Sequence, residues 1–298
     1  MTAALNQQFR IADRVRFVQG RGALTQVQLQ YANATASLYL QGAHIDSYKP
    51  NSAADLLWLS QSSKFEQGQP IRGGIPICWP WFGAPAQSTQ GPQHGFARIS
   101  EFDVVATNAD ANCTQIILQM RPAEPFPEWQ GKVRLEVEVR LSGQLWIELR
   151  TKNIGTDARE VGAALHTYFS VSNVLDASIS ELTGLDYKDK VQNFSQHRQT
   201  QDLVVDSEVD RIYLEPPTTV HLLDPLAARS IAIQAWGNTD LVVWNPGKHK
   251  AAEMPDFDDD GYNSMLCIEP ANALDNTIFL EPGQVHSLGK TIALMEPC

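Results

Sequence analysis

Long apolar runs, paired cysteines and a secretory leader are all missing from this sequence. No apolar run approaches the ~20 residues needed to span a bilayer. The first residues, MTAALNQQFRIADRVRF, lack a basic segment followed by an apolar one. The four cysteines, Cys78, Cys113, Cys267 and Cys298, are far apart and form no C-x-x-C pair, so we expect reduced thiols. Together these absences predict a cytoplasmic protein with no membrane partner.

Positive charge is also in short supply. Lys and Arg number 23 against 34 Asp and Glu, which gives a net charge of -11. Such a surface repels nucleic acid, so we expect no nucleic-acid partner. An anionic substrate would need a local patch of positive charge. There is no Walker loop, G-x-S-x-G elbow or G-x-G-x-x-G turn, and no histidine or cysteine pair at metal-ligand spacing, so we expect neither a cofactor nor a metal.

Helical stripes of apolar residues are absent, and the dominant periodicity is two. KVRLEVEVRL at 132–141 alternates apolar and charged residues, and LWIELR at 145–150 follows after a short turn, which is typical of a hairpin. Similar short runs recur at 26–30, 37–40, 115–120, 230–236 and 241–244. This pattern predicts an all-β fold, a sandwich or a barrel, formed by a single domain over residues 1–298.

One segment has a positive local charge. Between Gln67 and Ser100 there is no Asp, Glu or Lys, and the only full charges are Arg72 and Arg98. Arginine offers planar, paired donors that suit phosphate or carboxylate. Two interpretations remain open here: an anion site, or two arginines that tie down a loop by binding carbonyl groups.

Two further segments could carry acid–base chemistry. In VGAALHTYFSVS, residues 161–172, a strand would place His166 and Tyr168 on one face, behind small residues that leave room for a ligand. In SMLCIEPAN, residues 264–272, Glu269 would end a buried strand, where loss of solvent raises a carboxyl pKa toward the range of a general base. The alternatives are a structural histidine and an exposed glutamate.

An acidic segment, DFDDDG at 256–261, matches the first half of an EF-hand loop. The twelfth position of such a loop should be a glutamate, and here it is Cys267. We therefore expect an acidic surface loop and no calcium site of that type.

Six short motifs in order now resemble a known family. RGGIPICWPWFG, QHGFAR, HTYFSVS, EVDRIYL, WNPG and DDGYNSMLCIEP are similar to the hexose-6-phosphate mutarotases, also called glucose-6-phosphate 1-epimerases, of the aldose 1-epimerase superfamily. The resemblance runs from about residue 42 to residue 282. It implies a large antiparallel β-supersandwich of the galactose mutarotase type.

The resemblance also implies a site and a reaction. His166 and Glu269 match the catalytic acid and base, which would open and close the sugar ring of a hexose 6-phosphate and so interconvert its α and β anomers. We expect a monomer whose partner is a small sugar phosphate. The residues that match the family's substrate contacts are Arg72, Gln93, His94, Arg98 and Asp210.

Three other functions remain open. An epimerase of unphosphorylated aldoses would not need the two arginines. A glycosidase would need two carboxylates, whereas here the partner of Glu269 is a histidine. A non-catalytic carbohydrate-binding protein could share the fold, since fold does not determine function.

Overall fold

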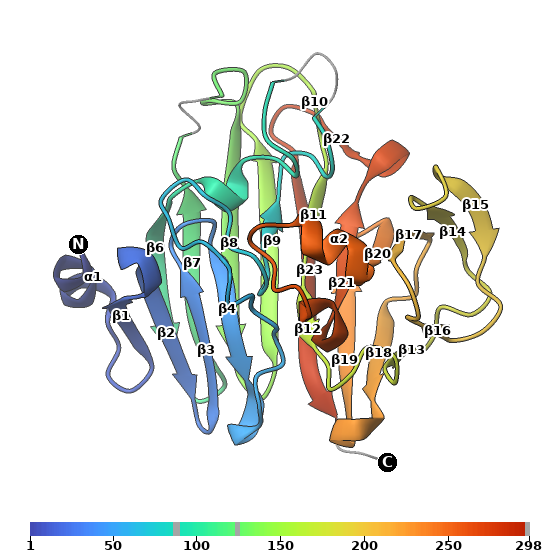
Figure 1. Ribbon diagram of the computed structural model, residues 1–298. Coiled ribbons are helices and arrows are strands. Elements are labelled where there is room, and N and C mark those ends of the chain that lie inside the picture. Colours follow the sequence, from blue (N-terminus) through green and yellow to red (C-terminus); the bar gives the residue numbers. More distant parts are fainter. Residues whose placement is uncertain (86–89, 123–125, 296–298) are drawn as a thin grey trace.

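The computed structural model describes residues 1–85, 90–122 and 126–295, and strands dominate it (Figure 1). All its pairs of named strands are antiparallel, which confirms the predicted all-β class. The N-terminal sheet has four strands in chain order: β1 (Val15–Gln19), β2 (Thr25–Tyr31), β3 (Ala34–Tyr39) and β4 (His44–Lys49).

The largest sheet has nine strands and the second has eight, and both draw strands from distant parts of the chain. In spatial order the nine-stranded sheet contains β16 (Leu203–Val204), β13 (Ser178–Ile179), β18 (Thr219–Asp224), β19 (Arg229–Trp236), β23 (Val285–Met295), β9 (Leu145–Asn153), β8 (Val133–Leu141), β7 (Thr114–Met120) and β6 (Phe102–Ala109). The eight-stranded sheet contains β15 (Ser195–Arg198), β14 (Asp186–Asp189), β17 (Val209–Leu214), β20 (Asp240–Asn245), β21 (Met265–Asn272), β11 (Ala163–Leu165) and β5 (Ile77–Cys78), with β12 (Tyr168–Ser170) also paired to β21. A small pair joins β10 (Arg159–Val161) to β22 (Ile278–Leu280).

The sheets form two layers. The nine-stranded sheet packs against the four-stranded sheet through β7 and β8, and against the eight-stranded sheet through β23. One apolar cluster fills the space between them and takes residues from β1 through β23, for example Phe17, Val137 and Ile292. The predicted hairpin at 132–150 is present as β8 and β9.

Helices are short within the described residues. They are α1 (Thr2–Phe9) and α2 (Gly247–Glu253), with six 3-10 turns at Arg21–Ala23, Pro50–Ser52, Ala97–Ile99, Pro225–Ala227, Gly261–Ser264 and Leu274–Asn276. No described helix has the length and apolar character needed to cross a bilayer.

The thiols of three cysteines are free. Cys78 and Cys267 are buried, Cys113 is half-buried, and none of the three forms a disulfide within the described residues. Cys298 lies outside the described residues.

Candidate active site

His166 and Glu269 face each other on neighbouring strands. β11 lies antiparallel to β21 with Ala164 opposite Ala271, and β12 continues the same register along β21. That register places His166 directly opposite Glu269, where two side chains lie on the same face of a sheet. The His166 Nδ1 atom is 3.3 Å from Oε1 of Glu269.

The structure corrects one expectation about Glu269. The sequence predicted that it ends a buried strand, but it lies within β21, which continues through Pro270 to Asn272. Pro270 lies opposite Leu241 in the β20–β21 ladder, and the pairing continues to Ala271 opposite Asp240. Glu269 is therefore fully buried, with 0% exposure.

The predicted alternation along residues 161–172 is confirmed, although the segment is divided into three short strands. Leu165 and Phe169 belong to the core cluster between the two layers. His166 lines a cavity on the opposite face of the sheet. The sheet therefore separates the apolar core from the acid–base pair.

Three aromatic rings hold the imidazole of His166. The ring of Tyr168 stacks on it at 4.8 Å between centroids and 9° between planes. Trp244 and His94 meet it edge-on at 5.9 Å and 5.8 Å. Such contacts leave the imidazole little rotational freedom.

Burial pushes both members of the pair toward their uncharged forms. It raises the pKa of Glu269 well above 4.5, and the carboxylate of Asp210 adds to this shift. It lowers the pKa of His166 well below 6.5, with further contributions from neighbouring positive charge. Within the described residues, neither carboxylate oxygen of Glu269 nor Nδ1 of His166 has a hydrogen-bond partner of good geometry. In the protein alone, burial therefore favours a neutral carboxyl group on Glu269 and a neutral imidazole on His166.

The pair lies in a cavity of about 370 Å³ lined by the eight-stranded sheet, by the segments before and after β5, and by α2. All seven residues that the resemblance implied line this one cavity. The lining residues are Arg72, Phe82, Gln93, His94, Arg98, His166, Lys190, Asp210, Val242, Trp244, Lys250, Met254 and Glu269.

The two predicted arginines differ in how they are held. Arg98 donates from Nη2 to the backbone oxygen of Gln93 at 2.7 Å, while its buried Nε has no partner within the described residues. Arg72 binds both carboxylate oxygens of Asp256 at 3.2 Å and donates to the hydroxyl of Tyr168 at 3.0 Å. Arg98 is thus open to a ligand, whereas most of the donors of Arg72 are engaged. The acidic segment at 256–261 accordingly supplies an anchor for Arg72.

Two lysines in the cavity were not found from the sequence. Lys190 pairs with Oδ2 of Asp210 at 2.8 Å, and Lys250 pairs with Glu208 at 2.6 Å. Lys190 follows β14, and Lys250 lies on α2, so neither belongs to a segment that the motifs singled out. The only available signal was position next to the predicted Asp210, and that position depends on the pairing of β14 with β17.

His94 is set up as a hydrogen-bond donor. Its Nδ1 accepts from the backbone N–H of Gly83 at 3.3 Å, which leaves the proton on Nε2. Burial and the cation of Arg98 lower its pKa to about 3, so the ring is neutral. Gln93, at the exposed rim of the same turn, has its side chain free within the described residues to contact a ligand.

One group of donors could hold a metal by distance alone. Ligand atoms of His166, Cys267 and Glu269 lie within 4.8 Å of one another. Their surroundings oppose a cation, since Arg72, Arg98 and Lys190 all act on His166. Burial also raises the pKa of the Cys267 thiol well above 9.0, whereas metal binding needs the thiolate. The donor set does not suit a resident metal.

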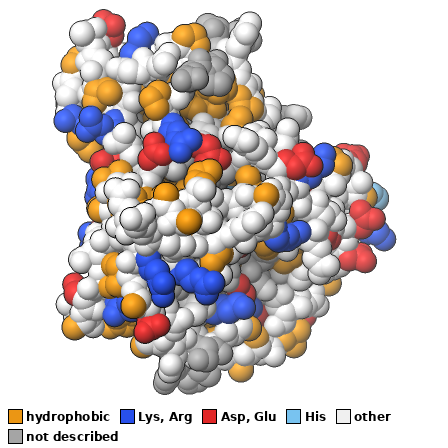
Figure 2. Space-filling view, turned by 90° about the vertical axis from the view of Figure 1, so that its left-hand side faces the viewer, with side chains coloured by type: hydrophobic (Ala, Val, Ile, Leu, Met, Phe, Trp, Pro, Cys, Tyr) orange, Lys and Arg blue, Asp and Glu red, His pale blue; other side chains and the backbone are white. Residues whose placement is uncertain are grey.

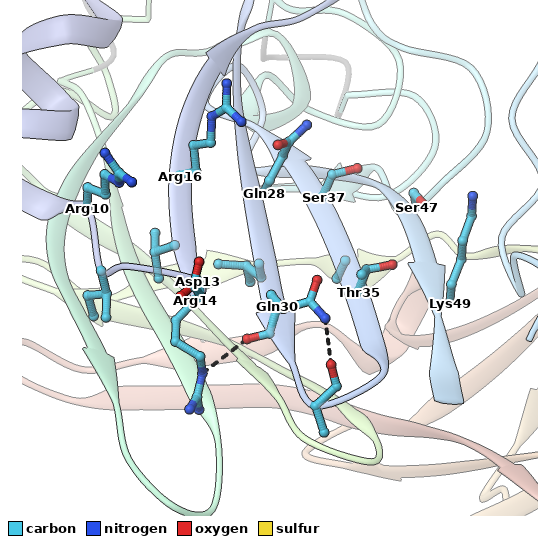
Figure 3. A pocket seen from close by; sticks show the side chains of 15 residues that line it. Arg10, Asp13, Arg14, Arg16, Gln28, Gln30, Thr35, Ser37, Ser47 and Lys49 are labelled. Atoms are coloured by element: carbon cyan, nitrogen blue, oxygen red, sulfur yellow. Dashed lines mark hydrogen bonds between the residues drawn. The ribbon is translucent and has the colours of Figure 1, made fainter. Parts of the chain in front are cut away.

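A second hollow, of about 730 Å³, lies on the outer face of the four-stranded sheet (Figure 3). Figure 2, in which the left-hand side of Figure 1 faces the viewer, shows Lys and Arg side chains close together on the lower half of that face. The described lining contains no histidine, and its only carboxylate is that of Asp13. Arg14 is held there by the backbone oxygen of Gln30. This hollow therefore has no acid–base pair, although it is the larger of the two.

Comparison with known proteins gives a consistent result. Residues 25–292 match the model of the family described as aldose 1-epimerase. A protein from Cenchrus ciliaris named "Putative glucose-6-phosphate 1-epimerase" is 35% identical over 263 residues, which cover 85% of this chain and 79% of that protein. One of the same name from Escherichia coli K12 is 33% identical over 269 residues, covering 88% and 89%.

Solved structures confirm the predicted fold. A structure described as a "putative mutarotase" from Salmonella typhimurium superimposes with a TM-score of 0.88 at 29% identity, over 97% of this chain and 96% of that one. Galactose 1-epimerase from Lactobacillus acidophilus shares the fold, with a TM-score of 0.73 at 12% identity, over 96% and 100%. This chain belongs to the aldose 1-epimerase family.

Proposed function

We propose that this protein interconverts the α and β anomers of a hexose 6-phosphate, with glucose 6-phosphate as the substrate to test first. The observation that carries the proposal is one cavity containing both an acid–base pair 3.3 Å apart and the unpartnered guanidinium nitrogen of Arg98. The first feature suits ring opening, and the second suits a phosphate. The names of the relatives support the same reaction.

Ring opening needs two proton transfers. Glu269, as the carboxylate, takes the proton from the anomeric hydroxyl, and His166, as the imidazolium, gives one to the ring oxygen. The bond between C1 and the ring oxygen breaks while the C1 carbonyl forms. The aldehyde then turns about the C1–C2 bond, and closure reverses both transfers. The pair needs only one proton, and the contact between the two groups allows it to lie on either.

Phosphate binding would shift the proton of the pair toward His166. The charges of Arg72, Arg98 and Lys190 help to lower the pKa of His166. A bound dianion offsets those charges, so the pKa of His166 rises and the imidazolium becomes accessible. The phosphate thus prepares the acid besides anchoring the sugar, and a free hexose lacks this effect.

Substrate contacts complete the proposal. Asp210 and the Nε2–H of His94 are placed to bind sugar hydroxyls, and Gln93 lies at the rim. We also propose a cytoplasmic location, which the free thiols of Cys78 and Cys267 and a phosphorylated substrate both favour. A monomeric state remains a prediction that light scattering would test.

The test of the function is exchange NMR between the anomers of glucose 6-phosphate, with and without protein. We expect cross-peaks between the two anomers that grow with protein concentration. Faster exchange for free glucose than for its phosphate would favour an epimerase of unphosphorylated aldoses. Binding without any exchange would favour the carbohydrate-binding alternative.

The pH profile of kcat/KM should be bell-shaped, because the pair must hold one proton. At low pH both groups are protonated, and no base remains. At high pH both are deprotonated, and no acid remains. Since the pKa of His166 is lowered and that of Glu269 is raised, the acidic limb reports mainly His166 and the basic limb mainly Glu269. Residual activity of Glu269→Gln should lose the acidic limb, because no carboxyl group has to be deprotonated, and should keep a fall at high pH, where His166 loses its proton; an acidic limb unchanged in that variant would contradict the assignment.

Chelators should not affect activity. The cations around His166, Cys267 and Glu269 oppose a metal ion, and the mechanism assigns it no role. Rates measured after EDTA treatment and gel filtration should equal those of untreated protein. Loss of activity that zinc or calcium restores would overturn this prediction.

A further inference from the structure

Lys290 occupies a core position that its strand otherwise fills with aliphatic residues. It lies on β23 between Leu288 and Ile292, on the face turned toward the other layer, and its exposure is 0%. Its neighbours across the sheet are Ile147 and Ala235. An aliphatic side chain would fit this position without the cost of removing an ammonium group from water.

The side chain of Lys290 crosses from one layer to the other. Its Nζ donates to the backbone oxygen of Leu165 at 3.4 Å and to the hydroxyl of Thr167. These are the residues immediately before and after His166. The ring of Phe169 lies 5.8 Å from Nζ on the same face of the sheet. Lys290 therefore holds, from the core side, the backbone that carries His166 on the cavity side.

Thr167 also stabilises the backbone next to His166. It is fully buried and donates to the oxygen of Leu165 at 3.1 Å. Its own backbone oxygen accepts from the N–H of Ile268, the residue before Glu269, at 3.1 Å. One polar cluster thus links the segments on both sides of the acid–base pair.

The position of Nζ beside Leu165 and Thr167, the residues that flank His166, also places an ionisable group behind the pair, on the core side of the sheet. Within the described residues it forms no ion pair, and the ionisable groups that act on it are Glu269 and Cys267 of β21. Burial lowers the pKa of Lys290 to about 7, while the carboxylate of Glu269 works in the opposite direction. The groups acting on Glu269 are Asp210, Lys190 and Lys290, with His166 in contact, and both lysines lower its pKa.

We propose that Lys290 is a positioning residue for the acid–base pair: from the core side of the sheet its ammonium group fixes the backbone of His166 and places a positive charge behind Glu269. The proposal rests on the proposed function for its kinetic consequences, but not for its structural ones. It adds to this site a residue from β23, a strand that lies outside the six sequence motifs.

The first test is Lys290→Met, which keeps the length of the side chain and removes its charge and donors. We expect kcat for glucose 6-phosphate to fall roughly 10- to 100-fold, because small displacements of reacting groups cost that much, while KM changes less than about threefold. Leu288→Met, on the same face of β23, is the matched control and should leave kcat near wild type. A folded Lys290→Met protein with wild-type kcat would overturn the proposal.

Thr167 provides a test that does not depend on the folding of Lys290→Met. Thr167→Val removes the hydroxyl at nearly constant shape and should lower kcat about tenfold, whereas Thr167→Ser, which keeps the hydroxyl, should restore most of it. Equal kcat in the valine and serine variants would show that the hydroxyl does not position His166, and this would overturn the positioning role.

Carbon-13 NMR of the Glu269 side chain tests the charge directly, with Glu269→Gln used to assign the signal. In Lys290→Met the titration midpoint of Glu269 should move up by roughly one pH unit, because a nearby positive charge is lost. An unchanged midpoint would overturn the role of the charge. This readout needs no turnover: if the wild-type protein fails to interconvert anomers, the proposed function fails, while the midpoint still decides the proposal for Lys290.

Discussion

Replacing Glu269 by glutamine should lower kcat for glucose 6-phosphate by about 100-fold or more, because glutamine cannot take the proton of the anomeric hydroxyl. His166→Ala should cost a similar factor by removing the acid. The double variant should lose less than the product of the two single effects, since the groups work as a unit. Rates come from exchange NMR at saturating substrate.

Stability separates this effect from damage to the fold. Glu269 is fully buried and its carboxylate has no hydrogen-bond partner within the described residues, so glutamine should unfold at the same or a higher temperature than wild type. The control is Glu136→Gln, on β8 of the nine-stranded sheet, which should change neither kcat nor the unfolding temperature. A folded Glu269→Gln protein with near-normal kcat would exclude Glu269 as the base.

Replacing Arg98 by alanine should lower kcat/KM for glucose 6-phosphate roughly 10- to 100-fold and leave the slower turnover of free glucose almost unchanged. Charge-assisted hydrogen bonds to a phosphate are worth about 1.5–3 kcal/mol each, and 1.4 kcal/mol corresponds to about a factor of ten. Added salt should slow the phosphorylated substrate more than the free sugar. Both substrates are to be compared in wild type, Arg98→Ala and the control Arg134→Ala.

Arg72→Ala should behave differently, although the sequence treated the two arginines alike. It leaves the carboxylate of Asp256 without its paired donors and the hydroxyl of Tyr168 without its partner. We therefore expect a lower unfolding temperature and a loss of turnover with both substrates. An Arg98→Ala protein that also loses turnover with both substrates would assign Arg98 a structural role.

The sequence could predict what depends on local alternation. The strands around 132–150 and the two faces of residues 161–172 follow from a period of two, and a short motif suffices to mark His166 or Glu269. The positive segment at 67–100 was predicted only from the charges within that segment. Asp256, the ion-pair partner of Arg72, lies 184 residues away along the chain, so the local sequence could not reveal that ion pair.

Contacts between sheets could not be predicted from the sequence for the same reason. Lys290 lies between the apolar residues Leu288 and Ile292 on one face of β23, and only the packing of β23 against β11 and β21 shows what its ammonium group meets. Lys190 and Lys250 enter the cavity from a strand end and a short helix that carry no motif. The lowered pKa of His166 also depends in part on these distant cations, which local sequence does not bring together.

The register that sets His166 opposite Glu269 restricts how this gene can change over evolutionary time. Because side chains alternate along a strand, inserting or deleting one residue between Met265 and Glu269 would turn the carboxylate into the apolar core. Inserting or deleting two residues would return the carboxylate to the cavity face of the sheet. It would, however, move Glu269 two residues along the strand, so that it no longer lies opposite His166. Variation in length among descendants of this sequence should therefore be confined to the loops, and lineages that retain the activity should keep β12 and the first half of β21 free of gaps.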